Sequence, residues 1–73
     1  RYLYTSGAEY KGMWQEGMRN GQGKMVYADG TWYEGGWVNN LMHGEGTYVD
    51  RDGVKWTGIF VNGGFESKVQ KKL

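Results

Sequence analysis

The chain has 73 residues, a formal net charge of +1 and no cysteine. Its length allows one small domain or a piece of a larger array, and the lack of cysteine excludes a disulfide framework and a thiolate metal site. The near-zero charge gives no strong field for attracting nucleic acid, and no apolar run approaches the ~18 residues of a membrane-spanning helix. The lack of cysteine also favours a reducing, intracellular setting.

The sequence repeats itself every 23 residues. The string YKGMW at residues 10–14 is matched by YEGGW at residues 33–37, and a third copy begins with WTGIF at residues 56–60. A fixed period of this length is typical of repeat architectures. Because the same shift aligns Gly7 with Gly30, and the chain starts without methionine, we expect a fragment of a longer protein with more repeats upstream. We divide the chain into the end of a preceding repeat (1–9), two repeats (10–32 and 33–55), a partial repeat (56–64) and a basic C-terminal tail (65–73).

Side chains alternate in character along most of the chain, which predicts β-strands because successive strand residues point to opposite faces. Turn signals such as Asp29-Gly30 separate the alternating segments. No connection is long enough for a parallel crossover. We therefore predict an all-β fold, a single-layer antiparallel meander of about six strands built hairpin by hairpin. The predicted strands span residues 1–5, 8–15, 21–27, 32–38, 44–49 and 54–61, and the first and last of these are the predicted edges.

The last residues depart from the repeat. Phe65, Val69 and Leu73 lie four residues apart, as on one side of a short helix, with lysines around them. We predict a short helical or irregular tail that caps the sheet or leads into a following helix.

Glycines recur at fixed places in the repeat. Gly17, Asn40 and Gly63 share one turn position, where only glycine or asparagine occurs, so we predict a positive φ there. Other glycines share a strand face with aromatic residues, where a flat ring can lie on the glycine of a neighbouring strand because no Cβ stands in the way. The glycines to which we assign a structural role are Gly12, Gly17, Gly21, Gly23, Gly30, Gly35, Gly44, Gly46, Gly53, Gly58 and Gly63.

Large rings dominate the glycine-bearing face. Burying one ring removes about 150–250 Å² from water. At about 25 cal/mol per Å², this outweighs the roughly 0.5–1 kcal/mol that a strand glycine costs. We interpret these rings as the core, and the alternative is that part of this face stays open as a concave groove. The rings of this groove or core are Tyr10, Trp14, Tyr27, Tyr33, Trp37, Tyr48, Trp56 and Phe60.

The opposite face carries more apolar residues than a solvated surface needs. Seven of them on one face of a small sheet would form a contiguous patch, and such patches mark interaction sites. We therefore expect this face to meet another protein or a neighbouring segment. The candidate partner face consists of Met13, Val26, Trp32, Val38, Val49, Ile59 and Val61.

The pattern Tyr-x-Gly-x-Trp, followed by Gly-x-Gly and Asp-Gly at a 23-residue period, resembles the MORN repeat (membrane occupation and recognition nexus). Residues 10–23 match it closely, and residues 33–46 match it apart from Asn40 at a usual glycine. Residues 56–63 match only the first half, with Trp56 in place of the tyrosine and Phe60 in place of the tryptophan. The resemblance implies a curved, single-layer stack of β-hairpins. It also implies scaffolds that bind partner proteins in the groove, form homodimers through terminal repeats, or bind acidic phospholipids.

Sites for catalysis are not apparent. His43 is the single histidine, and its place before a glycine is a common histidine position in the repeat that the chain resembles. Residues 21–24 (GQGK) lack the other residues of a phosphate loop, and residues 50–53 lack the remaining ligands of a calcium loop. The carboxylates are scattered singly, whereas a glycosidase needs two that face each other. The sequence therefore predicts no enzyme activity, no metal and no cofactor.

From this resemblance we expect a non-enzymatic scaffold or adaptor for protein–protein interactions, inside the cell, in a cytoskeletal, ciliary or membrane-associated assembly. Its expected partner is another protein, through a helix or strand, or a second copy through an edge strand. An alternative is a membrane-proximal module that binds acidic phospholipid through Lys68, Lys71 and Lys72, because a basic cluster favours an anionic surface. Nucleic acid is not expected, since nine basic residues nearly balance eight acidic ones.

Overall fold

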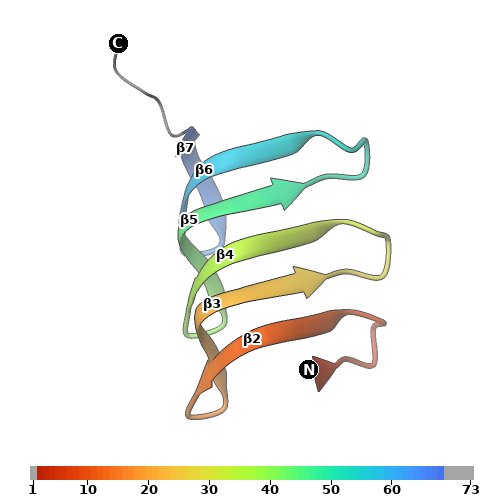
Figure 1. The fold of residues 1–73 in the computed structure, drawn as a ribbon, viewed down its shortest axis with the longest axis vertical. Helices are drawn as coiled ribbons and strands as arrows, with labels where there is room; N and C mark the ends of the chain where they lie inside the picture. Colours follow the sequence, from red (N-terminus) through yellow and green to blue (C-terminus); the bar gives the residue numbers. More distant parts are fainter. Residues whose placement is uncertain (1, 69–73) are drawn as a thin grey trace.

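Seven antiparallel strands lie side by side in the order in which they occur in the sequence, so each strand pairs with the next (Figure 1). The structure is a computed structural model that describes residues 2–68, with only the backbone for Ser67 and Lys68. The prediction of an all-β, single-layer meander is confirmed. The strands are β1 (Tyr2–Leu3), β2 (Glu9–Gln15), β3 (Met18–Val26), β4 (Trp32–Val38), β5 (Leu41–Val49), β6 (Lys55–Val61) and β7 (Gly64–Lys68).

Two kinds of connection alternate along the meander. At one side of the sheet, two-residue turns join β2 to β3, β4 to β5 and β6 to β7. The predicted positive φ is confirmed there, with 79° at Gly17, 72° at Asn40 and 91° at Gly63. The residue before each of these also has a positive φ, as type I′ turns require and as the right-handed twist of hairpins favours. Because these turns are so short, β3 and β5 begin three residues earlier than the sequence predicts.

Wider connections lie at the other side of the sheet (Figure 1). In the connection between β3 and β4, the Tyr27 amide donates to the Thr31 carbonyl at 2.8 Å and the Gly30 amide donates to the Tyr27 carbonyl at 3.0 Å. The Asp29 carboxylate accepts hydrogen bonds from the amide and the hydroxyl of Thr31 at 3.0 and 2.7 Å. The same two backbone bonds recur in the connection before β2 and in the one between β5 and β6. The repeat in the sequence is therefore a repeat in the backbone.

The strand register places glycines beside one another across the sheet. Gly12 pairs with Gly23, and the pairing continues through Gly35, Gly46 and Gly58, one glycine on each of five strands. The adjacent cross-strand row on the same face holds large side chains, because residues two apart on a strand share a face. That row consists of Tyr10, Met25, Tyr33, Tyr48 and Trp56.

Irregular pairing bends the sheet toward this face. The register shifts between Gly12 and Trp14 in the β2–β3 pair, and between Gly35 and Trp37 in the β4–β5 pair. Bulged strands bend and twist more than regular ones, and the strands curve strongly near the tight turns (Figure 1). The curvature gives one layer of strands an inner face, on which the buried side chains gather.

The prediction for the start of the tail is wrong. Residues 64–68 form strand β7 instead of a helix, and the Phe65 ring packs on Phe60 at a centroid distance of 5.2 Å. The edge prediction is also wrong at this end, because β6 pairs with both β5 and β7. The cause is the unpaired edge that β6 would otherwise present, which a following segment covers through backbone hydrogen bonds. The remaining tail, with Val69 and Leu73, lies outside the described residues. Residues 2–68 contain no helix long and apolar enough to cross a membrane.

Candidate functional site

Two tyrosine rings lie directly on the glycine row. The Tyr10 ring covers Gly12 and Gly23, and a methyl group added at Gly23 would clash with the Tyr10 ring and hydroxyl. The Tyr33 ring covers Gly35 and Gly46 in the same way one repeat later. Each hydroxyl reaches the irregular part of its own strand, where Tyr10 donates to the Met13 carbonyl and Tyr33 to the Gly36 carbonyl, both at 2.9 Å. The glycines thus provide the space in which these rings are buried.

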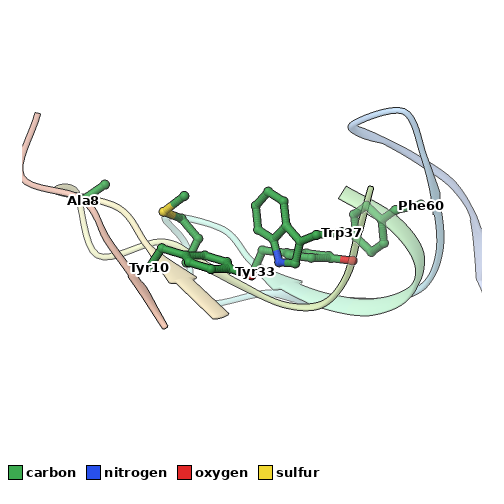
Figure 2. Packing of buried hydrophobic residues seen from close by; sticks show 6 residues of the cluster. Ala8, Tyr10, Tyr33, Trp37 and Phe60 are labelled. Atoms are coloured by element: carbon green, nitrogen blue, oxygen red, sulfur yellow. The ribbon is translucent and has the colours of Figure 1, made fainter. Parts of the chain in front are cut away.

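Other rings stand upright against the two tyrosines. Tyr10 and Tyr33 lie flat along the sheet, whereas Trp37 and Phe60 stand across it (Figure 2). Trp37 is edge-to-face with both tyrosines, at centroid distances of 5.5 and 5.3 Å, which is a favoured geometry for aromatic pairs. Its indole Nε1 donates to the Gly23 carbonyl at 3.1 Å. A continuous ladder of T-shaped contacts runs through Trp14, Tyr10, Trp37, Tyr33, Phe60 and Phe65.

Burial along the ladder is uneven. Tyr10, Tyr33, Trp37 and Phe60 are buried, and Ala8 and Met25 complete the core. Tyr27 and Tyr48 are half-buried and pack against it, whereas Trp14 and Trp56 are exposed. Burial raises the pKa of the Tyr33 hydroxyl to about 12. Burial also raises the pKa of Tyr10 and of Tyr27.

An arginine fills the inner face beside the first repeat. The Arg19 guanidinium carbon lies 4.8 Å from the Trp37 ring centroid and within 6 Å of the centroids of Tyr4 and Tyr10. One terminal nitrogen donates to the Tyr4 hydroxyl and the other to the Asn40 carbonyl, both at 3.0 Å. We call this space, bounded by Tyr4, Tyr10, Trp37 and Asn40, the first compartment. It is occupied by the chain's own cation.

The equivalent space beside the second repeat is a hollow of about 490 Å³. We call it the second compartment. Residue 42, which is 23 positions after Arg19, is methionine, so no guanidinium enters the space. The walls are mainly apolar, with Asp29 and Thr31 as polar contributors. The largest wall residues are Tyr27, Met42, Tyr48, Phe60 and Phe65.

A family model described as MORN repeat matches residues 10–32 and 33–55. The chain belongs to the MORN-repeat family. Membership of this family indicates a role in binding a membrane or another protein. A comparison with curated proteins gave no significant match.

The outer face of this MORN sheet is mixed in character. Val26, Trp32 and Val49 are cross-strand neighbours and form one apolar row. The next row on this face is polar and contains Lys11, Lys24, Glu34, Thr47 and Thr57. It separates these three from Met13, Val38, Ile59 and Val61, which lie nearer the tight turns, so the expected contiguous patch is divided in two. The Lys24 ammonium lies 4.5 Å from the Trp32 ring centroid, and Trp32 is half-buried.

Titratable groups elsewhere in the MORN sheet hold the turns in place. Hydrogen bonds from Thr31 lower the pKa of Asp29, and hydrogen bonds from Trp56 and Val54 lower the pKa of Asp50. His43 is exposed on β5. No three of the histidines, aspartates and glutamates within residues 2–68 come together as a metal site would require. Of the candidate lipid contacts, Lys68 ends β7, and Lys71 and Lys72 lie outside the described residues.

Six residues of the two compartments had no predicted site role: Tyr4, Arg19, Asp29, Thr31, Met42 and Phe65. Comparing the repeats position by position would have shown that one repeat has an arginine where the next has a methionine, because the 23-residue shift aligns Arg19 with Met42. The Asn62-Gly63 pair before Phe65 is among the strongest hairpin signals and would have predicted β7.

Proposed function

We propose that this MORN-repeat chain is a non-enzymatic protein-interaction scaffold that holds a partner protein on its inner, aromatic face. The observation that carries the proposal is the second compartment, an apolar hollow of about 490 Å³ on a sheet only one layer thick. Concave, mostly apolar sites with a few polar groups are the usual form of a binding site. Exposed rings beside the hollow, Trp56 and Phe65, can add the aromatic contacts that dominate interface energetics.

Open sheet edges support the same proposal. Within residues 2–68, β1 and β7 are each paired on one side only, so a partner strand or a second copy can add to either edge. The setting that we propose is an intracellular assembly of cytoskeletal, ciliary or membrane-associated type, as the family resemblance implies. Phospholipid binding has less support, because acidic residues accompany the neighbouring lysines Lys11 and Lys24 on the outer face. Glu34 is the cross-strand partner of Lys24, and Glu9 lies two residues before Lys11 on the same face of β2.

The test compares an inner-face variant with a matched outer-face variant. The immobilised chain is used to capture partners from cell extract, alongside Phe65→Ser and Trp32→Ser, which each remove one partly exposed ring. We expect a protein that the wild type and Trp32→Ser retain and that Phe65→Ser loses. Retention by Phe65→Ser and loss by Trp32→Ser would transfer the binding to the outer face and contradict the proposal.

A lipid experiment on the wild type, and on a variant with Lys68, Lys71 and Lys72 replaced by glutamine, tests the membrane-binding role of the family. The chain is sedimented with phosphatidylcholine vesicles, with and without phosphatidylserine, at two salt concentrations. We expect no sedimentation. Salt-sensitive sedimentation with the anionic vesicles that is lost on replacing Lys68, Lys71 and Lys72 by glutamine would replace the scaffold by a membrane-binding module.

A further inference from the structure

The two compartments have equivalent walls but different contents. Tyr27, Phe60 and Gly63 in the second compartment correspond, 23 positions on, to Tyr4, Trp37 and Asn40 in the first. The backbone bonds correspond as well, since the Asn40 amide donates to the Arg19 carbonyl at 3.0 Å and the Gly63 amide to the Met42 carbonyl at 2.9 Å. The first compartment therefore shows how a ligand can be held in the second.

A guanidinium in the first compartment has three kinds of support. Aromatic faces surround it, the Tyr4 hydroxyl accepts one hydrogen bond and the Asn40 carbonyl accepts another. The second compartment offers the counterpart of each. The Phe60 and Tyr27 rings stand in the equivalent places, the Gly63 carbonyl replaces that of Asn40, and within residues 2–68 the Tyr27 hydroxyl makes no hydrogen bond. A flat guanidinium suits such a site better than an ammonium, because it stacks on rings and donates in a fixed fork.

Charge distinguishes the second compartment from the first and also favours a cation. Asp29 lines the second compartment at the position that Ser6 holds in the first. Its Oδ1 accepts the two hydrogen bonds from Thr31, and the other carboxylate oxygen makes no hydrogen bond to another residue within residues 2–68. Arg51 is close enough for its charge to act on Asp29, but no ion pair joins the two side chains. A carboxylate with an available oxygen beside aromatic walls complements a positive ligand.

We propose that the second compartment is a receptor for an arginine side chain of a protein partner, held between Tyr27 and Phe60 as Arg19 is held in the first compartment. The volume of about 490 Å³ also accommodates residues that flank the arginine. The proposal rests on the proposed scaffold function and specifies the chemistry of the partner. Met42 is the determinant, because it leaves the place of Arg19 vacant.

The test uses the whole chain labelled with ¹⁵N and a short peptide, acetyl-Gly-Arg-Gly-amide. We expect saturable shifts of the Thr31, Phe60 and Gly63 amides. The peptide with citrulline in place of arginine has nearly the same shape but no charge, and we expect it to bind about tenfold more weakly. Equal binding of the arginine and citrulline peptides, or no saturable shift with either, would overturn the proposal.

Variants identify the site. Met42→Arg places the chain's own guanidinium in the second compartment, so peptide affinity should fall at least about tenfold, whereas Met13→Arg adds the same charge on the outer face and should leave it unchanged. Asp29→Asn should lower the affinity for the peptide about two- to fivefold. It provides a second test of the site if Met42→Arg does not fold. Arg19→Met should empty the first compartment and create a second set of shifts near Asn40. Unchanged binding by both Met42→Arg and Asp29→Asn would contradict the proposal.

Two other outcomes have distinct meanings. If the wild type binds no peptide but a variant with Lys71 and Lys72 changed to glutamine does, the chain's own tail occupies the second compartment. The proposal that a partner's arginine occupies it would then be wrong. If no form binds the peptide while extract proteins still bind in a manner sensitive to Phe65→Ser, the scaffold stands and its arginine specificity fails. Failure of both experiments would remove the proposed function itself.

Discussion

Trp14 and Trp37 occupy the same place in two consecutive repeats, yet Trp14 is 41% exposed and Trp37 is 3% exposed. Trp37 stands between Tyr10 and Tyr33 and lies under the Arg19 guanidinium. Trp14 has Tyr10 on one side and only Tyr2, from the two-residue strand β1, on the other. The same residue is therefore buried or exposed according to its neighbours, as expected for a repeat protein in which each unit contacts only the adjacent ones.

The largest expected effect tests this contrast directly. Trp37→Ala removes a buried ring and its hydrogen bond to Gly23, and should lower the free energy of unfolding by about 3–5 kcal/mol. A chain of this length has roughly that much stability in total, so we expect Trp37→Ala to be largely unfolded. Trp14→Ala is the matched control and should cost less than about 1 kcal/mol. Urea denaturation followed by far-ultraviolet circular dichroism measures both, and equal costs would mean that neighbours do not decide the role of the tryptophan.

The second prediction concerns a feature that the two repeats share. Tyr10 and Tyr33 are both fully buried over glycines, so Gly23→Ala and Gly46→Ala should be similarly harmful, each by about 1–3 kcal/mol, because the added methyl displaces a ring. Gly64→Ala is the control. A Cβ there would meet only the Val61 carbonyl oxygen at 3.7 Å, an ordinary contact, and the change should stay within about 0.5 kcal/mol. A much smaller loss of stability for Gly23→Ala than for Gly46→Ala would show that the weaker packing around the exposed Trp14 extends through the whole first repeat.

The smallest effect is the dependence of stability on alkaline pH. The pKa of Tyr33 is raised from 10.0 to about 12, so its stabilising contribution is complete below pH 10 and is lost as the pH rises to 12. The loss attributable to Tyr33 should be about 1.4 kcal/mol by pH 11. The positive charge of Arg19 partly offsets the effect of burial on the pKa of Tyr10. Tyr33→Phe should therefore flatten the pH profile of unfolding more than Tyr10→Phe does, and the reverse order would contradict the contrast between the repeats.

The hairpins could be predicted from the sequence because their causes are local. A positive φ at Gly17, Asn40 and Gly63 follows from which residues occupy one position in each repeat, and alternation along 32–38 fixes strand β4 to the residue. The seating of rings on glycines could be predicted as well, since both lie on one strand face.

The rest depends on contacts between segments. The four-residue spacing of Phe65 and Val69 favours a helix locally, but the open edge of β6 recruits residues 64–68 as a strand. The hollow beside Met42 could not be predicted from any single repeat, because it depends on a methionine at the position where the preceding repeat has Arg19. Exposure of Trp14 likewise depends on how little of the preceding repeat covers it. Sequence patterns specify the unit, and the neighbours decide what each copy buries.

The strands lie crosswise to the longest axis of the sheet, along which the chain extends 43 Å (Figure 1). Tension applied between β1 and β7 therefore acts along the interstrand hydrogen bonds, and these break in turn instead of all together in shear. Under mechanical load the ribbon should peel one hairpin at a time and lengthen at low force, so an assembly that pulls on it would meet a compliant tether.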